Sequence, residues 1–173
     1  MDSLDSIFKE KTHLIEERNK NLPPLISKKR KEIKDAVKLK SDLKKSTAFV
    51  KKLKMINSDG LQQCIRECET LNLNLYVSEI VTSLLEMNIK ATDIPGMVKL
   101  CTALHVRYEE FIDPFITSLK ETVLKPLQTG NEDAAKQRRL QIRLLIDLYQ
   151  VGLFDDIELF RSLLINVTGK TKP

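Results

Sequence analysis

The stretch RLQIRLLIDLYQVGLF, from Arg139 to Phe154, decides the fold class because its apolar residues recur at intervals of three and four. This spacing places them on one face of an α-helix, whereas a half-buried strand would alternate apolar and polar residues. Two other parts of the chain have the same spacing. The residues that show it are Leu140, Leu144, Leu148 and Val151; Tyr76, Ile80 and Leu84; and Leu100, Leu104, Tyr108 and Phe111. The sequence therefore predicts an all-α protein.

Short polar joints divide the chain from Ser46 onward into a series of helices. The expected helices cover residues 47–57, 60–70, 74–89, 93–112, 114–126, 132–152 and 156–168. Several joints carry side chains that can accept a hydrogen bond from a free backbone N–H at a helix start. These are Ser46 or Thr47, Asn74, Asp93, Asp113 before Pro114, and Asp155 with Asp156. Such helices form antiparallel arrays, either HEAT-like repeats of roughly 40–47 residues or an irregular bundle.

The same spacing identifies the expected core of this array. Its predicted buried side chains are Leu100, Leu104, Tyr108, Leu144 and Leu148. Each lies on the apolar stripe of its helix, where it would face the neighbouring helices rather than water.

The N-terminal part of the chain is expected to form a separate arm. Residues 3–20 predict one helix, and Pro23-Pro24 predict its end, because proline has no backbone N–H and restricts the residue before it. A second, lysine-rich helix should begin near Pro24 and continue to about Leu39. The expected division is an N-terminal helical arm at residues 1–45, basic in its second half, followed by a helical-repeat domain at residues 46–173.

The positive charge of the chain is concentrated in one segment. The 173 residues have a net charge of +5, whereas residues 28–54 contain 12 lysines and arginines and 3 acids, a local charge of +9. No apolar run approaches the ~20 residues of a membrane span, and the acidic N-terminus does not predict a signal peptide. Three cysteines in a lysine-rich chain indicate free thiols. We expect a cytoplasmic protein, with a perinuclear position or shuttling to the nucleus as variants.

Residues 43–54, LKKSTAFVKKLK, predict a short amphipathic helix. Its apolar face would consist of Phe49, Val50 and Leu53, continued by Ile56. The candidate RNA or partner contacts of the basic segment, called here the basic stripe, are Lys28, Lys29, Arg30, Lys31, Lys44, Lys45, Lys51, Lys52 and Lys54. Three uses are open: a solvated face that pairs with acids of the same domain, contact with RNA phosphates, or contact with an acidic protein.

RNA contact through the basic stripe would be weak and independent of base sequence. Recognition of single-stranded RNA usually adds stacking aromatic side chains to the phosphate contacts. Phe49 is the one aromatic residue in residues 28–54, and its spacing assigns it to the core. A second, smaller basic cluster consists of Lys136, Arg138, Arg139 and Arg143, and we expect it to pair with acidic loops of the domain.

The sequence does not predict catalysis, a metal site or a cofactor. Cys64 and Cys68 are four residues apart, as are Cys101 and His105, and two such pairs could begin a metal site. Cysteine also serves as a small core residue, and C-x-x-C spacing is missing. We expect His105 to be half-buried and to bond a neighbouring loop rather than to act as a general base. The five glycines are scattered, so they form no phosphate-binding loop.

Three segments in series carry a resemblance to a known family. They are LKKSTAFVKKLK at 43–54, LNLNLYVSEIV at 71–81 with VKLCTALHVRYEEF at 98–111, and RLQIRLLIDLYQVGLF at 139–154. Together they resemble the first middle domain, of the initiation factor 4G type, in the regulator of nonsense transcripts 2 family. The resemblance implies a short α-solenoid of HEAT-like helix pairs. It also implies that His105, Arg107 and Tyr108 are a structural signature of one helix.

The same resemblance implies a non-catalytic scaffold module of the nonsense-mediated mRNA decay machinery, which supports assembly of the surveillance complex. The implied partners are other decay-complex proteins, a helicase and an exon-junction-associated factor, bound through the full-length scaffold. The isolated domain is expected to be monomeric. Two alternatives remain: an RNA-binding helical module that uses the basic stripe, and a helicase-docking domain of a translation initiation factor.

Overall fold

The computed structural model describes residues 2–27, 42–54, 58–126 and 132–168. Within these ranges the regular elements are helices, which confirms the predicted all-α class. They are α1 (Asp2–Ser27), α2 (Leu43–Leu53), α3 (Ser58–Thr70), a 3₁₀ turn (Asn74–Tyr76), α4 (Val77–Leu85), α5 (Ile94–Arg107), α6 (Ile112–Leu124), α7 (Glu132–Gln150) and α8 (Ile157–Thr168). The predicted division into an arm at 1–45 and a domain at 46–173 stays a prediction.

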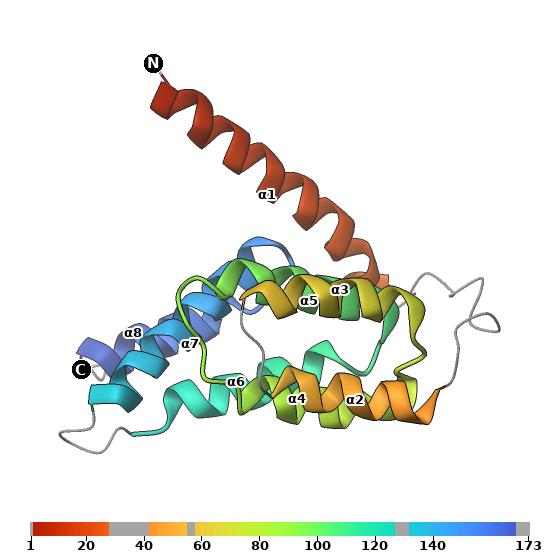
Figure 1. The fold of residues 1–173 in the computed structure, drawn as a ribbon. Coiled ribbons are helices and arrows are strands. Elements are labelled where there is room, and N and C mark those ends of the chain that lie inside the picture. The colour runs from red at the N-terminus through yellow and green to blue at the C-terminus, as the bar shows by residue number, and fades with distance from the viewer. Residues whose placement is uncertain (1, 28–41, 55–57, 127–131, 169–173) are drawn as a thin grey trace.

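From α2 onward the helices stack in two layers (Figure 1). The helices α2, α4 and α6 pack in one layer, and α3, α5 and α7 pack in the other. Contacts of α2 with α3, α5 with α6, and α6 with α7 join the layers, and α8 packs on α6. Each helix pair is therefore placed beside the preceding pair, which is the arrangement of a HEAT-like repeat.

An aliphatic core fills the space between the two layers. All five side chains predicted to be buried are buried: Leu100, Leu104, Tyr108, Leu144 and Leu148. The layer of α3 and α5 is tight at Gly96, because a Cβ there would lie 2.9 Å from Leu61 Cδ1. Removal of this apolar surface from water is the main force that holds the stack, at about 25 cal/mol per Å².

The start of α2 differs from the prediction. Asp42, rather than Ser46 or Thr47, is the N-cap, and its Oδ1 accepts a hydrogen bond from Lys45 N–H at 3.1 Å. Ser46 is buried inside the first turns, and the Thr47 hydroxyl donates to Leu43 O at 2.7 Å. An aspartate caps a helix as well as serine does, so the earlier start adds a turn without leaving its N–H groups unbonded.

Helix α5 ends at Arg107, earlier than the predicted residue 112. At Tyr108 the backbone becomes extended, with φ −118° and ψ 110°. The Tyr108 hydroxyl accepts a hydrogen bond from Leu73 N–H at 3.1 Å and donates to Leu71 O at 3.3 Å. These contacts bind the joint between α3 and α4, so a long-range bond, invisible in local spacing, fixes where α5 stops.

Four other predicted caps have mixed outcomes. Asp93 is the N-cap of α5, although its carboxylate accepts from Lys90 N–H, and Asp156 Oδ1 accepts from Leu159 N–H of α8 at 3.3 Å. Asp113 is not a cap, because α6 begins one residue earlier and holds Pro114 in its first turn. Proline is tolerated there because the first N–H groups of a helix have no helical acceptor. Asn74 is also not a cap; its N–H is bound by Asn72 Oδ1 at 3.2 Å.

The predicted end of the first helix at residue 20 is wrong, because α1 continues through Pro23 and Pro24 to Ser27. Proline has a helix-compatible φ, so its cost inside a helix comes from the missing donor and from crowding of the preceding turn. Tertiary contacts immediately before the prolines fix the direction of α1. The predicted basic helix beyond Ser27, including Lys28, Lys29, Arg30 and Lys31, lies outside the described residues.

Helix α1 contacts α5 and the end of α7. Arg18 Nη1 donates to Tyr149 O at 2.7 Å, and Asn21 Nδ2 donates to Val151 O at 2.8 Å. Gly152 has φ 74°, and a Cβ at this position would lie 2.9 Å from Arg18 Cγ. The glycine therefore serves both the turn after α7 and the close approach of α1. None of the described helices is long and apolar enough to cross a membrane.

Candidate nucleic-acid or partner interface

The described half of the basic stripe lies on α2, and its helical phase is as predicted. Phe49 and Leu53 are buried, and Val50 is half-buried against the core. Lys44, Lys45 and Lys51 are exposed. The alternation of apolar and basic residues in LKKSTAFVKKLK thus produces one docked face and one basic face.

Acidic side chains of the same domain bind part of this basic face. Lys52 Nζ lies 2.8 Å from Glu67 Oε1 of α3, and Lys54 Nζ lies 2.9 Å from Glu86 Oε2 after α4. Lys45 Nζ lies 3.9 Å from Asp42 at the helix start. Exposed pairs of this kind contribute roughly 0–1 kcal/mol each. Within the described part of the chain, Lys44 and Lys51 have no acidic side chain at ion-pair distance, so they are the cations that an external anion could reach.

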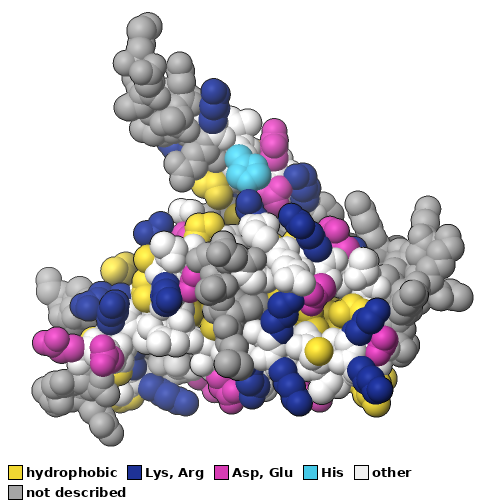
Figure 2. All heavy atoms as spheres, in the orientation of Figure 1, with side chains coloured by type: hydrophobic (Ala, Val, Ile, Leu, Met, Phe, Trp, Pro, Cys, Tyr) yellow, Lys and Arg dark blue, Asp and Glu magenta, His cyan; other side chains and the backbone are white. Residues whose placement is uncertain are grey.

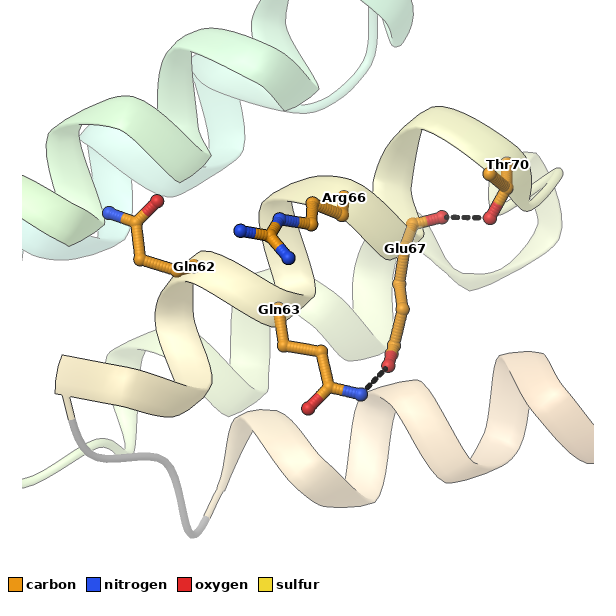
Figure 3. Close-up of a pocket in the computed structure, with 5 residues that line it drawn as sticks. All are labelled: Gln62, Gln63, Arg66, Glu67 and Thr70. Carbon is orange, nitrogen blue, oxygen red and sulfur yellow. Dashed lines mark hydrogen bonds between the residues drawn. The ribbon is translucent and has the colours of Figure 1, made fainter.

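A polar hollow of about 520 Å³ lies beside this face on α3. It is lined by Gln62, Gln63, Arg66, Glu67 and Thr70 (Figure 3). Gln63 Nε2 donates to Glu67 Oε1 at 2.9 Å, and the Thr70 hydroxyl donates to Glu67 O at 3.1 Å. Lys52 Nζ donates to the same Oε1, so the Glu67 carboxylate holds both Gln63 and Lys52 in place. The hollow offers hydrogen-bonding groups and one arginine.

The second basic cluster lies along α7 and does not pair as predicted. Arg143 Nε lies 3.9 Å from Asp147 Oδ2, one turn further along the same helix, rather than near an acidic loop. Lys136 and Arg139 are exposed and Arg138 is half-buried. A pair at i and i+4 can form on any helix surface, and this local partner replaces the expected long-range one.

The comparisons with known proteins agree on one relationship. The chain is 33% identical over 140 residues to Regulator of nonsense transcripts UPF2 of Arabidopsis thaliana, which covers 76% of this chain and 12% of that protein. It is 35% identical over 124 residues to Regulator of nonsense transcripts 2 of Homo sapiens, covering 70% and 9%. The crystal structure of the first MIF4G domain of human nonsense mediated decay factor UPF2 superimposes with a TM-score of 0.76 and 30% identity, over 96% of this chain. This chain belongs to the family of first UPF2 MIF4G domains.

The extent of these matches differs between relatives. The chain spans about one tenth of the length of the curated relatives and 54% of the human MIF4G crystal structure. The N-terminal mIF4G domain of S. cerevisiae Upf2 shares the fold, with a TM-score of 0.68 at 22% identity. No protein-family model matches the chain.

In this MIF4G domain, the residues His105, Arg107 and Tyr108 have contacts of a structural kind. His105 is fully buried rather than half-buried, and its Nε2 lies 3.4 Å from Asn21 O of α1 instead of bonding a loop. Arg107 Nη1 donates to Glu69 O at 3.4 Å. Together with the Tyr108 hydroxyl, these side chains connect the end of α5 to α1 and α3. Burial raises the pKa of Tyr108, which keeps its hydroxyl a donor.

The cysteines of the MIF4G domain are buried free thiols. Burial raises the pKa of Cys64 to about 11 and that of Cys101 to about 12, and it raises the pKa of Cys68 as well. The thiolate is the form that binds metals and reacts, so burial disfavours both. Among the described residues, no group of three or more His, Cys, Asp or Glu side chains could hold a metal ion.

Two features of this MIF4G domain were not predicted from its sequence. The acids Glu67 and Glu86 lie 15 and 32 residues from the lysines they bind, so no spacing rule connects them. The second feature is a cleft between α1 and the layer of α3, α5 and α7. The α1 wall of this cleft, His13, Leu14 and Glu17, lies within the predicted helix 3–20, whose spacing gives no sign of the helices it packs on.

Proposed function

We propose that this chain is a non-catalytic scaffold module of the nonsense-mediated mRNA decay machinery. The observation that carries the proposal is the superposition of 96% of the chain on the first MIF4G domain of human UPF2 at 30% identity. The names of the curated relatives, which are regulators of nonsense transcripts, support the same pathway. In this role the stacked helix pairs supply a rigid body with large exposed faces, and partners bind those faces.

We further infer that the partners are other proteins of the decay complex. A helicase and an exon-junction-associated factor would be assembled by the full-length scaffold, and the module itself would act as a monomer in the cytoplasm. The tight α3–α5 packing at Gly96 and the bonds of Tyr108 support a rigid spacer, because they fix the angle between neighbouring helix pairs.

A domain replacement tests this function. The first MIF4G domain of human UPF2 is replaced by residues 1–173 of this chain in cells depleted of endogenous UPF2, and the half-life of a reporter mRNA with a premature stop codon is measured. The replacement should restore rapid decay of that reporter and leave the matched reporter without the premature stop unchanged. A reporter that stays as stable as with the domain deleted would contradict the proposal.

A second candidate function is weak RNA contact through phosphates. The observation that favours it is the exposure of Lys44 and Lys51, which have no acidic side chain at ion-pair distance among the described residues. Lys45 would add to this contact, together with Lys28, Lys29, Arg30 and Lys31 if they lie on the same side. Lys52 and Lys54 would contribute less, because Glu67 and Glu86 already neutralise them.

A further inference from the structure

A cleft of about 620 Å³ lies between α1 and the layer of α3, α5 and α7. Its walls come from four helices that are far apart in the sequence. The lining residues from α1 are His13, Leu14 and Glu17, and the opposite wall includes Ile65 of α3, Val98 and Lys99 of α5, and Arg143 of α7. A volume of this size lies within the usual range of ligand pockets, about 300–1,000 Å³.

The floor of the cleft is aliphatic. Leu14, Ile65 and Val98 are half-buried, so part of each side chain remains open to the cleft, and Val151 lies beneath them. Figure 2 shows hydrophobic side chains at the place where α1 meets the body. Among the described residues, the lining contains no Phe, Tyr or Trp. An apolar floor without aromatic rings suits aliphatic side chains of a protein better than the bases of RNA, which bind by stacking.

The rim of the cleft carries two exposed cations, Lys99 and Arg143. Glu17 is bound by Lys20 at 2.7 Å, whereas Asp147 lies 3.9 Å from Arg143 Nε, and the Arg143 side chain stays 66% exposed, so it can bind a second carboxylate. Lys99 is exposed and has no acidic side chain at ion-pair distance in the described ranges. Gln62 lines both this cleft and the polar hollow on α3, which adds Arg66 and Glu67 beside the rim.

We propose that this cleft binds an amphipathic, acidic segment of a partner protein. Leucine- or isoleucine-like side chains of that segment would occupy the floor formed by Leu14, Ile65 and Val98, and its carboxylates would bind Lys99 and Arg143. This is the helix-in-groove mode of peptide recognition, in which apolar anchors recur at three and four residues. The inference rests on the scaffold function proposed above, to which it adds a docking site and the chemistry of its occupant.

A displayed library of random 16-residue peptides, selected against the full chain, tests the proposal. The enriched sequences should carry leucine or isoleucine at intervals of three and four together with Asp and Glu. A labelled enriched peptide should bind about tenfold more weakly to the variant K99E/R143Q, because two charge contacts are lost. The matched control K44E/K51Q makes the same change of charge on α2 and should leave the affinity unchanged.

Three outcomes would overturn the proposal. The first is that no peptide family is selected. The second is that the selected peptides bind K99E/R143Q as tightly as the wild type. The third is that no peptide binds, whereas a labelled uridine oligomer binds and K99E/R143Q abolishes that binding. Circular dichroism should show the same melting midpoint for both double variants, since all four side chains are exposed. The domain replacement separates the two proposals. Restored decay of the reporter mRNA without peptide binding contradicts only the cleft proposal. Peptide binding without restored decay of the reporter contradicts only the proposed role in nonsense-mediated decay.

Discussion

The stack of α2–α7 and the N-terminal helix α1 are held by different forces. Leu61, Leu104 and Leu144 of the stack are fully buried, and many neighbours share the apolar contacts. In contrast, α1 is held near its C-terminal end, where it packs on α5 and where Arg18 and Asn21 each donate to one backbone carbonyl at the end of α7. Apolar burial spread over many residues gives a cooperative unit, whereas a helix held by a few polar bonds can open alone. It follows that α1 can open locally, and expose the surface around it, while the stack of α2–α7 stays folded.

Truncation of core leucines should have the largest effect, and it should act on the stack. L104A and L144A each remove a fully buried side chain between the layers and should cost about 2–5 kcal/mol of unfolding free energy. Urea unfolding followed by circular dichroism measures this loss. The control L75A alters a side chain that is 86% exposed and should change stability by less than about 0.5 kcal/mol. Unchanged midpoints for both core variants would show that the helical phase is wrong.

Substitution of Gly152 acts at the boundary between the two regions. G152A places a Cβ at φ 74° and within 2.9 Å of Arg18 Cγ, so it should cost about 1–2 kcal/mol from the backbone conformation alone. Thermal unfolding measures the total cost. G152N tolerates the left-handed conformation better but keeps the contact with Arg18. A smaller loss for G152N than for G152A would isolate the backbone part, and equal stability of G152A and the wild type would disprove the tight junction.

The buried thiols predict a pH dependence that belongs to the stack alone. Their folded pKa values, about 11 for Cys64 and about 12 for Cys101, lie above the ordinary value of 9.0. The unfolded chain therefore releases these protons first, and the stability present below pH 9 falls as the pH rises toward 11. At pH 10, each thiol should lower the unfolding free energy by roughly 1 kcal/mol relative to pH 7. Urea unfolding at pH 7 and pH 10 should show a smaller drop in unfolding free energy for C101A than for the wild type, by the contribution of one thiol. An equal drop in both proteins would contradict the burial of Cys101.

Charge reversal on α2 should have the smallest effect on stability. K44E/K51E changes exposed side chains and should move the unfolding free energy by less than about 0.5 kcal/mol. If the basic stripe contacts RNA, fluorescence anisotropy with a labelled uridine oligomer should show binding at low salt that this variant abolishes. Affinity should fall with salt at a log–log slope of about −0.7 per phosphate neutralised. Absence of binding at low salt would remove the RNA hypothesis.

The sequence predicts the stack well and the junction of α1 poorly, for a physical reason. Apolar spacing at three and four identifies Leu100, Leu104 and Leu144 as buried, because the buried face of a helix can be read from the local sequence of that helix. The bonds of Asn21 to Val151 and of Lys52 to Glu67 connect residues 130 and 15 positions apart, and they appear only once the helices are packed. Local preference likewise predicts an end at Pro23 and Pro24, whereas α1 runs through both residues.

Amide hydrogen exchange tests most directly whether α1 and the stack are separate units. Amides of residues 9–20 in α1 should exchange through local opening, much faster than those of residues 100–107 in α5, which should open only with global unfolding. The double variant R18A/N21A should accelerate exchange in α1 and leave α5 unchanged, because it removes the two bonds to the carbonyls of Tyr149 and Val151. Equal protection of α1 and α5, lost together in the double variant, would contradict the account and make α1 part of one cooperative core.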